Sequence, residues 1–421
     1  MNTRIACLLL ILIAHASATA APKFPLRLDA ALVSTVGLAR ISALTWSHDG
    51  KTLASNGVET KVIKGTPTSV NQLILWDAEN WAQEPKNRIS VNNLGAVVEA
   101  DFFDPNNSSR LAIYLNDLGR FSYGILNLNR PKDKPRIIGQ ELKLVHSPGR
   151  TGLRSDNWSR DGKKIAFNHL VGNTGSNYHI SIVDAVSGKK LHTLNPHKAL
   201  QTGRRDFGYV WDWSPGGKYL VTHTGSSLVV FDNKLEEELF RFDLLNFNSN
   251  RASSLGIQAV GWDPTGKEIA FSDGRKNMNF LDVSDLGKNE DQKGAPSRYK
   301  QVKPDRSFPM KDKDREGKGI ELPGILAWGP QGRRIAVTFT KKERMLIGTK
   351  RGGPIVHIPV IHIYSKGGTL LHEFVVKNLF RHPKKTHTFD FRVASLEWSP
   401  DGFKIAAGLG DGTIRVFKTP K

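Results

Sequence analysis

Cysteine is almost absent from the chain: its 421 residues include one, Cys7, close to the N-terminus. A single thiol excludes intramolecular disulfides and zinc-thiolate clusters. Long apolar runs are also absent, since no segment reaches the roughly 20 apolar residues that span a bilayer as a helix. Acidic residues are scarce, with 40 Asp and Glu against 60 Lys and Arg, so the formal net charge is +20. A basic excess of this size favours anionic partners and says nothing about the fold.

The first twenty residues, MNTRIACLLLILIAHASATA, have the pattern of a secretory signal peptide. Arg4 precedes a short apolar run from Ile5 to Ala14, and small-residue cleavage sites follow at 16–18 and 18–20. We therefore expect an exported mature protein, periplasmic or extracellular, with no membrane span. Cleavage would also remove the only cysteine, which excludes a cysteine nucleophile.

One short pattern recurs seven times in the rest of the chain. An aromatic residue that ends a strand is followed by Ser, Asp or Gly, a turn of the Pro-Asp-Gly type and a second strand. A basic residue opens the second strand in most copies. Six of the nine tryptophans occupy the aromatic position, so the chain is a repeat array. The seven aromatic residues are Trp46, Phe103, Trp158, Trp213, Trp262, Trp328 and Trp398.

Further strands follow each copy, such as 72–77 and 227–232 as third strands and 238–244 as a fourth. Four antiparallel strands in each of seven units predict an all-β fold, a seven-bladed β-propeller with four-stranded antiparallel blades. The propeller would be a single domain over residues 24–421. No four-stranded sheet covers both its faces, so the repeated aromatic residue should pack between adjacent blades.

The last unit, residues 393–418, stops after its third strand, close to the end of the chain. The segment FPLRLDAALV at 24–33 reads as a strand that belongs to no unit. We expect this N-terminal strand to join the last blade and close the ring, because closure removes exposed sheet edges. The alternative is a loose N-terminal arm.

These repeats resemble the WD-repeat propellers and the TolB-type propeller repeats of bacterial envelope proteins. The resemblance rests on Trp-Ser-Pro-Asp-Gly at 398–402, GDGTIRVF at 410–417, NWSRDGKKIAF at 157–167 and LILWD, which ends at Trp76-Asp77. The Gly-His pair that opens a WD repeat is missing, and only Trp76-Asp77 keeps the signature dipeptide in its strand. The His-Asp hydrogen-bond network of that family is therefore not expected here.

Three charged segments exceed what a blade needs: 287–319, 340–353 and 376–387. Each has four more basic than acidic residues. Residues 287–319 have no apolar period, which predicts a flexible insertion. The second and third segments would emerge on one face as loops, because connections between second and third strands and connections between blades leave a propeller on the same side. The repeated turns would lie on the opposite face.

These loops suggest a basic binding face for an anionic partner, with Phe380 or Tyr299 as stacking groups. The alternative is that the charges only solvate the protein. We expect a non-catalytic, monomeric scaffold that binds a protein or an anionic envelope polymer, with nucleic acid a weaker candidate. The candidate binding residues are Lys341, Lys342, Arg344, Lys350, Arg351, Arg381, Lys384 and Lys385.

Two other functions stay open: an enzyme with its site at the channel mouth, and a TolB-like component of envelope assembly. Gly-x-Ser-x-Gly is absent, so the sequence offers no nucleophile elbow. Carboxylates on the first strands, Asp101, Asp156, Asp212 and Glu397, are the candidates for catalysis, or else pair with basic neighbours. We expect no cofactor and no metal, since His357 and His362 fall on opposite faces of a strand and His372, His382 and His387 are scattered.

Overall fold

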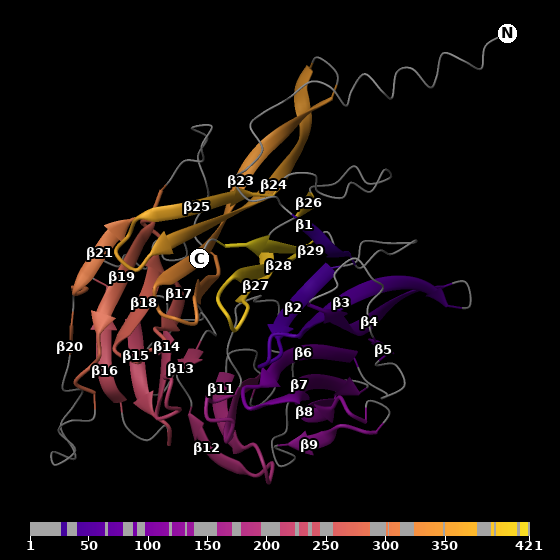
Figure 1. Cartoon of the computed structure of the whole chain (residues 1–421), viewed down its shortest axis with the longest axis horizontal. Helices are drawn as coiled ribbons and strands as arrows, with labels where there is room; N and C mark the ends of the chain where they lie inside the picture. The colour runs from indigo at the N-terminus through magenta and orange to yellow at the C-terminus, as the bar shows by residue number, and fades with distance from the viewer. Residues whose placement is uncertain are drawn as a thin grey trace.

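Within the residues that the computed structural model describes, the chain forms 29 β-strands and no helix (Figure 1). The described residues are 27–31, 40–63, 66–78, 87–90, 97–117, 120–130, 133–138, 158–170, 178–194, 211–223, 227–234, 238–244, 256–286, 300–301, 303–311, 324–347, 350–376, 389–390, 393–410 and 413–419. The signal-peptide segment 1–20 lies outside them.

The strands form seven small sheets, one for each repeat, and the sheets are the blades of a β-propeller. Blade one contains β2 (Arg40–Trp46), β3 (Thr52–Ile63), β4 (Thr66–Asp77) and β5 (Asn87–Ser90). Blade two contains β6 (Val97–Asp104), β7 (Asn107–Asp117), β8 (Arg120–Asn127) and β9 (Arg136–Ile138). Blade three contains β10 (Lys164–Leu170), β11 (Tyr178–Asp184) and β12 (Lys190–Leu194), with Trp158 bridged to Ile165 at the first-strand position.

The next two blades show the repeat at its most regular. Blade four contains β13 (Trp211–Trp213), β14 (Tyr219–His223), β15 (Ser227–Asp232), β16 (Glu238–Asp243) and a short parallel addition, β20 (Lys300–Gln301). Blade five contains β17 (Ile257–Trp262), β18 (Glu268–Asp273), β19 (Asn277–Asp282) and β21 (Arg306–Pro309).

Strand β21 lies inside the segment 287–319, so the prediction of one flexible insertion is wrong for this part. Arg306–Pro309 pairs with β19 as the outer strand of blade five.

Blade six contains β22 (Leu326–Trp328), β23 (Arg334–Ile347), β24 (Lys350–Ser365), β25 (Leu370–Val375) and β26 (Phe389–Asp390). Blade seven contains β27 (Val393–Trp398), β28 (Lys404–Leu409), β29 (Thr413–Lys418) and β1 (Arg27–Ala31). Strand β1 pairs antiparallel with β29, from Arg27 opposite Val416 to Ala31 opposite Thr413. The N-terminal strand therefore closes the ring, which confirms the closure prediction and the seven-bladed fold.

In most blades the side chain of the residue that follows the aromatic organises the turn between the first and second strands. In blade one, the Ser47 hydroxyl donates to Asp49 at 2.6 Å and accepts from the backbone N of Thr52 at 2.9 Å. Gly50, with φ of 69°, lies in the left-handed region that glycine adopts without strain. Blade three repeats the arrangement, with the Ser159 hydroxyl donating to Asp161 at 2.6 Å. The short pattern Trp-Ser-x-Asp-Gly thus satisfies its own backbone groups on what we name the turn face.

The repeated aromatic residues join neighbouring blades, as predicted. The indole N–H of Trp398 donates to the Ala327 carbonyl at 3.0 Å, and that of Trp328 donates to the Gly261 carbonyl at 3.2 Å. The residue that opens the second strand also covers the aromatic of the next blade. Lys404 lies 6.0 Å from the Trp46 ring centroid. Arg334 lies 5.3 Å from the Trp398 ring and Arg110 lies 5.2 Å from the Trp158 ring, so basic residues at this position make cation–π contacts.

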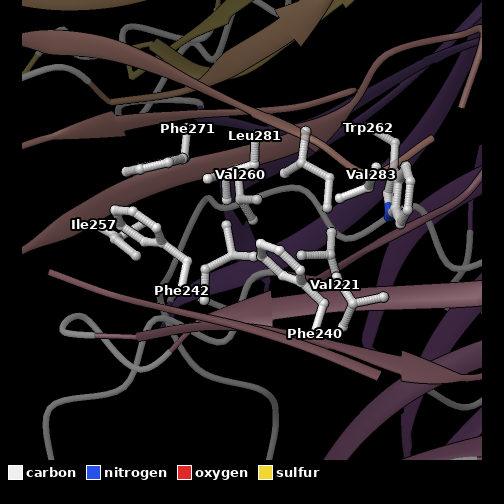
Figure 2. Packing of buried hydrophobic residues seen from close by; sticks show 12 residues of the cluster. Val221, Phe240, Phe242, Ile257, Val260, Trp262, Phe271, Leu281 and Val283 are labelled. Carbon is white, nitrogen blue, oxygen red and sulfur yellow. The ribbon is translucent and has the colours of Figure 1, made fainter. Parts of the chain in front are cut away.

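Apolar side chains from facing sheets fill the space between blades. Figure 2 shows the cluster between blades four and five, where Phe242 and Phe271 lie with ring centroids 5.0 Å apart. Trp262 is 1% exposed at one end of this cluster and stacks with Tyr219 at 6.4 Å. The core of the protein is thus divided into layers between blades, and the first strands contact each other around the axis.

Candidate functional site

The longest projection from the ring is the hairpin of β23 and β24 in blade six (Figure 1). These strands have 14 and 16 residues, whereas β18 and β19 at the same position in blade five have six each. Their pairing runs without a break from Arg334 opposite Ser365 to Arg344 opposite Ile355, then resumes after a bulge to Ile347 opposite Lys350. The segment 340–353 was expected to be a loop, but the structure makes most of it a two-stranded arm.

Four of the eight candidate binding residues lie on this arm. Lys342 and Arg344 are in β23, and Lys350 and Arg351 are in β24. Leu346 pairs with Arg351, next to the closing pair of the hairpin. The backbone therefore collects four basic positions on one ordered element. The candidates Arg381, Lys384 and Lys385 lie outside the described residues, as do the proposed stacking groups Phe380 and Tyr299.

Lys341 differs from this group. It lies in β23 opposite Ile358, at the base of the arm, and is 2% exposed. The residue before it, Thr340, is 8% exposed. Lys341 is therefore an interior residue at the junction between arm and ring, and the expectation that it contributes a surface charge is wrong.

The base of the arm is held from a second side by the chain that leads into blade seven. Phe389 pairs with Val356 and Asp390 pairs with His357, in parallel orientation. Strand β26 thus continues along β24 from the place where β25 ends, since β25 reaches only Val360. The third basic segment, 376–387, precedes β26 in the sequence by one residue.

Blade one carries a second long hairpin on the same face of the ring. Strands β3 and β4 have 12 residues each and pair from Thr52 opposite Asp77 to Ile63 opposite Thr66. Strands β14 and β15 of blade four, by contrast, are joined directly after the pair His223–Leu228. We name this side the hairpin face. Its connections vary between blades far more than those of the turn face.

His362 of blade six belongs to a buried hydrogen-bond network. His362 is fully buried, with Nδ1 3.0 Å from the Tyr364 hydroxyl and Nε2 3.2 Å from the Glu373 carboxylate. Lys311, which follows the outer strand of blade five, donates to Glu373 at 3.0 Å. Burial raises the pKa of Tyr364 to about 12, which keeps its hydroxyl protonated. The network therefore fastens blade five to blade six.

Within the described part of the chain, no three potential metal ligands gather in one place. His357 lies in β24, and His372 stacks with Phe374 at 6.1 Å, while His382 and His387 lie outside the described residues. The described residues also include no helix long and apolar enough to cross a membrane.

Two of the four candidate carboxylates accept hydrogen bonds from the next blade. The backbone N of Trp262 donates to Asp212 at 2.7 Å, and the backbone N of Trp46 donates to Glu397 at 3.2 Å. Asp101 lies in β6, and Asp156 lies outside the described residues. In both cases the donor is the backbone N–H of a repeated aromatic residue in the next blade. Spacing within one unit could not predict this link between first strands.

A family model described as WD domain, G-beta repeat matches residues 381–418, which include β26 and the three C-terminal strands of blade seven. No curated protein matches the chain.

Proposed function

We propose that this β-propeller, whose C-terminal residues 381–418 match the WD repeat model, is an exported, non-catalytic scaffold that recognises an anionic macromolecule. Propellers of this type commonly serve as protein-interaction scaffolds, in which a rigid ring presents variable connections to a partner. The arm of blade six beyond its buried base, residues 342–357, is the proposed contact.

The observation that carries this proposal is the position of four basic residues on paired strands. Lys342, Arg344, Lys350 and Arg351 belong to an arm whose backbone is hydrogen-bonded along its length. An ordered backbone loses less conformational entropy on binding than a loop of the same composition. Guanidinium groups also suit carboxylate and phosphate partners, because they donate two parallel hydrogen bonds.

The neighbouring basic segment supports the same surface. Arg381, Lys384 and Lys385 precede β26 in the sequence, and β26 pairs with the base of the arm. The chain over 376–387 has no acidic residue. We infer that these residues add to the positive potential around the arm, which would steer an anionic partner toward it.

The class of partner follows from the proposed location. The signal-like pattern of residues 1–20 supports export, and an exported protein meets acidic proteins and anionic envelope polymers rather than nucleic acid. The two candidate carboxylates Asp212 and Glu397 hold blades together, which disfavours a channel-mouth enzyme built on them. We propose a monomer, because the ring closes on its own N-terminal strand.

The test is salt-dependent retention of the mature protein on an immobilised polyanion. The variant combines Lys342→Glu, Arg344→Glu, Lys350→Glu and Arg351→Glu. A matched control reverses the same number of charges on the turn face, at the exposed residues Lys51, Lys163, Lys267 and Arg333. Both variants have the same net charge. The arm variant should elute at clearly lower salt than the control, since exposed charge contacts are screened by salt.

Equal elution of the two variants would contradict the proposal. Retention would then depend on total charge, and the basic residues of the arm would serve only solvation. Circular dichroism of both variants checks that each retains the all-β fold.

A further inference from the structure

A cavity of about 180 Å³ lies at the axis of the ring on the turn face. It is lined by residues from four successive blades, among them Glu397 of blade seven, Trp46 of blade one, Phe103 of blade two and Trp158 of blade three. Residues of four adjacent blades meet only near the axis, and each of these residues lies at or next to the turn end of its first strand. The cavity is therefore a hollow at the mouth of the central channel.

The hollow lies where the repeat departs from its pattern. Phe103 occupies the position that Trp holds in the other six units, and an indole is larger than a phenyl ring. The pairing of β6 with β7 shifts register on both sides of Phe103. Bulges of this kind re-aim side chains and occur often beside functional sites. The missing volume of the indole thus accounts for space that the regular units fill.

The carboxylates at the cavity already have partners. Asp104, 2% exposed, accepts from the backbone N of Asn106 at 2.9 Å and pairs with Arg110 at 2.8 Å. Glu397 accepts from the backbone N of Trp46 at 3.2 Å. The charge of Asp104 is thus balanced by Arg110, and the Glu397 carboxylate is held against the backbone of blade one.

The basic side chains at the cavity, in contrast to the carboxylates, lack partners within the described protein. Arg160 is half-buried and His48 is exposed, and both line the cavity. Neither side chain has a hydrogen-bond or ion-pair partner in the structure as described. A guanidinium is rarely withdrawn from water without a partner. The protein therefore supplies no acceptor to Arg160, and a ligand that fits can supply one.

Aromatic rings form the rest of the wall. Arg110 covers the Trp158 ring and Lys404 covers the Trp46 ring, so both indoles are held in place by contacts within the protein. An apolar cavity of about 150 Å³ takes up benzene. The hollow thus has room for one ring-sized apolar group together with a small polar head.

We infer that this cavity binds a carboxylate attached to a ring-sized apolar body, with Arg160 as the carboxylate ligand and the aromatic wall around the apolar body. Two sources share this chemistry: a free small acid, and the C-terminal carboxylate of a partner that ends in an aromatic residue. The cavity is on the opposite face from the arm, so this inference does not depend on the proposed function.

Calorimetric titration of the mature protein with benzoate tests the site, and benzylamine is the matched probe of similar shape and opposite charge. Benzoate should bind saturably and benzylamine should not. Arg160→Met should weaken benzoate binding by about tenfold or more, the loss expected for a charged hydrogen-bond donor. Lys163→Met, three residues along and exposed, is the control and should bind as the wild type does. Tighter binding of benzylamine, or an unchanged Arg160→Met variant, would overturn the inference.

A second variant separates loss of the site from loss of the fold. Phe103→Trp introduces the residue of the other units and should fill the hollow, which abolishes benzoate binding while the melting temperature is kept or raised. A variant that folds and binds benzoate as before would place the ligand elsewhere and contradict the inference.

Short peptides distinguish the two sources. A peptide that ends in phenylalanine with a free carboxylate is compared with its C-terminal amide. Tighter binding of the free-acid peptide than of benzoate, lost on amidation, identifies a partner's C-terminus. Binding of benzoate without binding of either peptide identifies a free acid. Failure of benzoate and of both peptides would show that the cavity is not a carboxylate site.

Discussion

The connections on the turn face of the ring are nearly uniform, whereas those on the hairpin face differ in length between blades. On the turn face, six units have a glycine of positive φ between the first and second strands, at 50, 162, 217, 266, 332 and 402. On the hairpin face, the same second strand continues for six residues in blade five and for 14 in blade six. One end of each strand is therefore uniform and the other is free to vary.

The difference has a physical cause. The turn residues satisfy local backbone groups and aim the aromatic residue into the neighbouring blade, so a change there disturbs two blades. An extended hairpin satisfies its backbone groups by its own pairing and can grow without changing the contacts of the ring. Stability is thus concentrated on the turn face and in the layers between blades, and variation in function is easiest on the hairpin face.

The largest expected effect comes from breaking an inter-blade contact. Trp262→Ala should lower the free energy of unfolding by about 3 to 5 kcal/mol, because it leaves a cavity in the layer between blades four and five. The residue is 1% exposed and stacks with Tyr219. Urea denaturation measures the change. Phe403→Ala is the control, since Phe403 is a turn-face aromatic that is 39% exposed, and it should cost about 0.5 kcal/mol or less. Similar losses in the two variants would contradict the layered description of the core.

Acid sensitivity should appear first at the hairpin-face end of blade four. His223 ends β14, and burial lowers its pKa to about 4 from the usual 6.5. Between these values the unfolded chain binds the proton and the folded protein does not, so stability falls as pH falls. The free energy of unfolding should drop by about 2 kcal/mol from about pH 7 to pH 5. Urea denaturation at both pH values measures this drop, and His223→Gln should remove it.

The turn face should resist the same change in pH. Burial alone would raise the pKa of Asp263, but hydrogen bonds from Thr265 and from the backbone of Glu268, with the charge of Lys366, hold it below its usual value. A carboxylate with a lowered pKa loses its contribution only below about pH 4. A stability drop between pH 7 and pH 5 that persists in His223→Gln would assign the acid sensitivity to another group.

Substitution of two adjacent glycines measures how much the left-handed backbone conformation of one turn contributes to stability. Gly217 has φ of 63°, and Gly216 beside it has open space where a Cβ would lie. Gly217→Ala should cost about 1 to 2 kcal/mol, because an L-residue is strained in the left-handed region, and Gly216→Ala should be close to neutral. Thermal melting of both variants provides the comparison. Equal melting temperatures would show that the turn tolerates a change of backbone conformation.

The smallest effect on stability is expected from shortening the arm. Replacement of residues 343–356 by Asn-Gly keeps the pair Lys342–His357 and forms a two-residue hairpin turn. The buried residues Val337, Phe339 and Val360 lie below the cut, so the free energy of unfolding should change by less than about 1 kcal/mol. Urea denaturation and polyanion retention are measured together, and retention should fall. A loss of several kcal/mol would mean that the arm stabilises the ring.

Local patterns predicted the ring well, because its repeated features depend on neighbouring residues. The aromatic and the Pro-Asp-Gly turn identified each blade, and the unpaired strand at 24–33 predicted the closure that β1 provides. The outer strand of blade five was missed because Arg306–Pro309 is a short strand within a charged segment. Its signal is the pair of apolar residues Phe308 and Met310, two positions apart within a charged segment.

The candidate sites were harder to predict, since they depend on residues from different blades. The segment 340–353 has no alternation of apolar residues, yet β23 and β24 pair through their backbones, which any side chains allow. Burial of Lys341 follows from its place at the base of the arm. The cavity on the turn face combines residues of four blades, and only the irregular Phe103 marked its position in the sequence.

The sequence by itself determined the number of blades, the turn at the end of each first strand and the strand that closes the ring, because these follow from local hydrogen bonds, glycine conformation and strand pattern. Only the tertiary structure decided which residues meet across blades. The hydrogen bonds from Trp262 to Asp212 and from Trp46 to Glu397 join residues 50 and 351 positions apart. Contacts at such separations depend on how blades are stacked around the axis, which no short segment specifies.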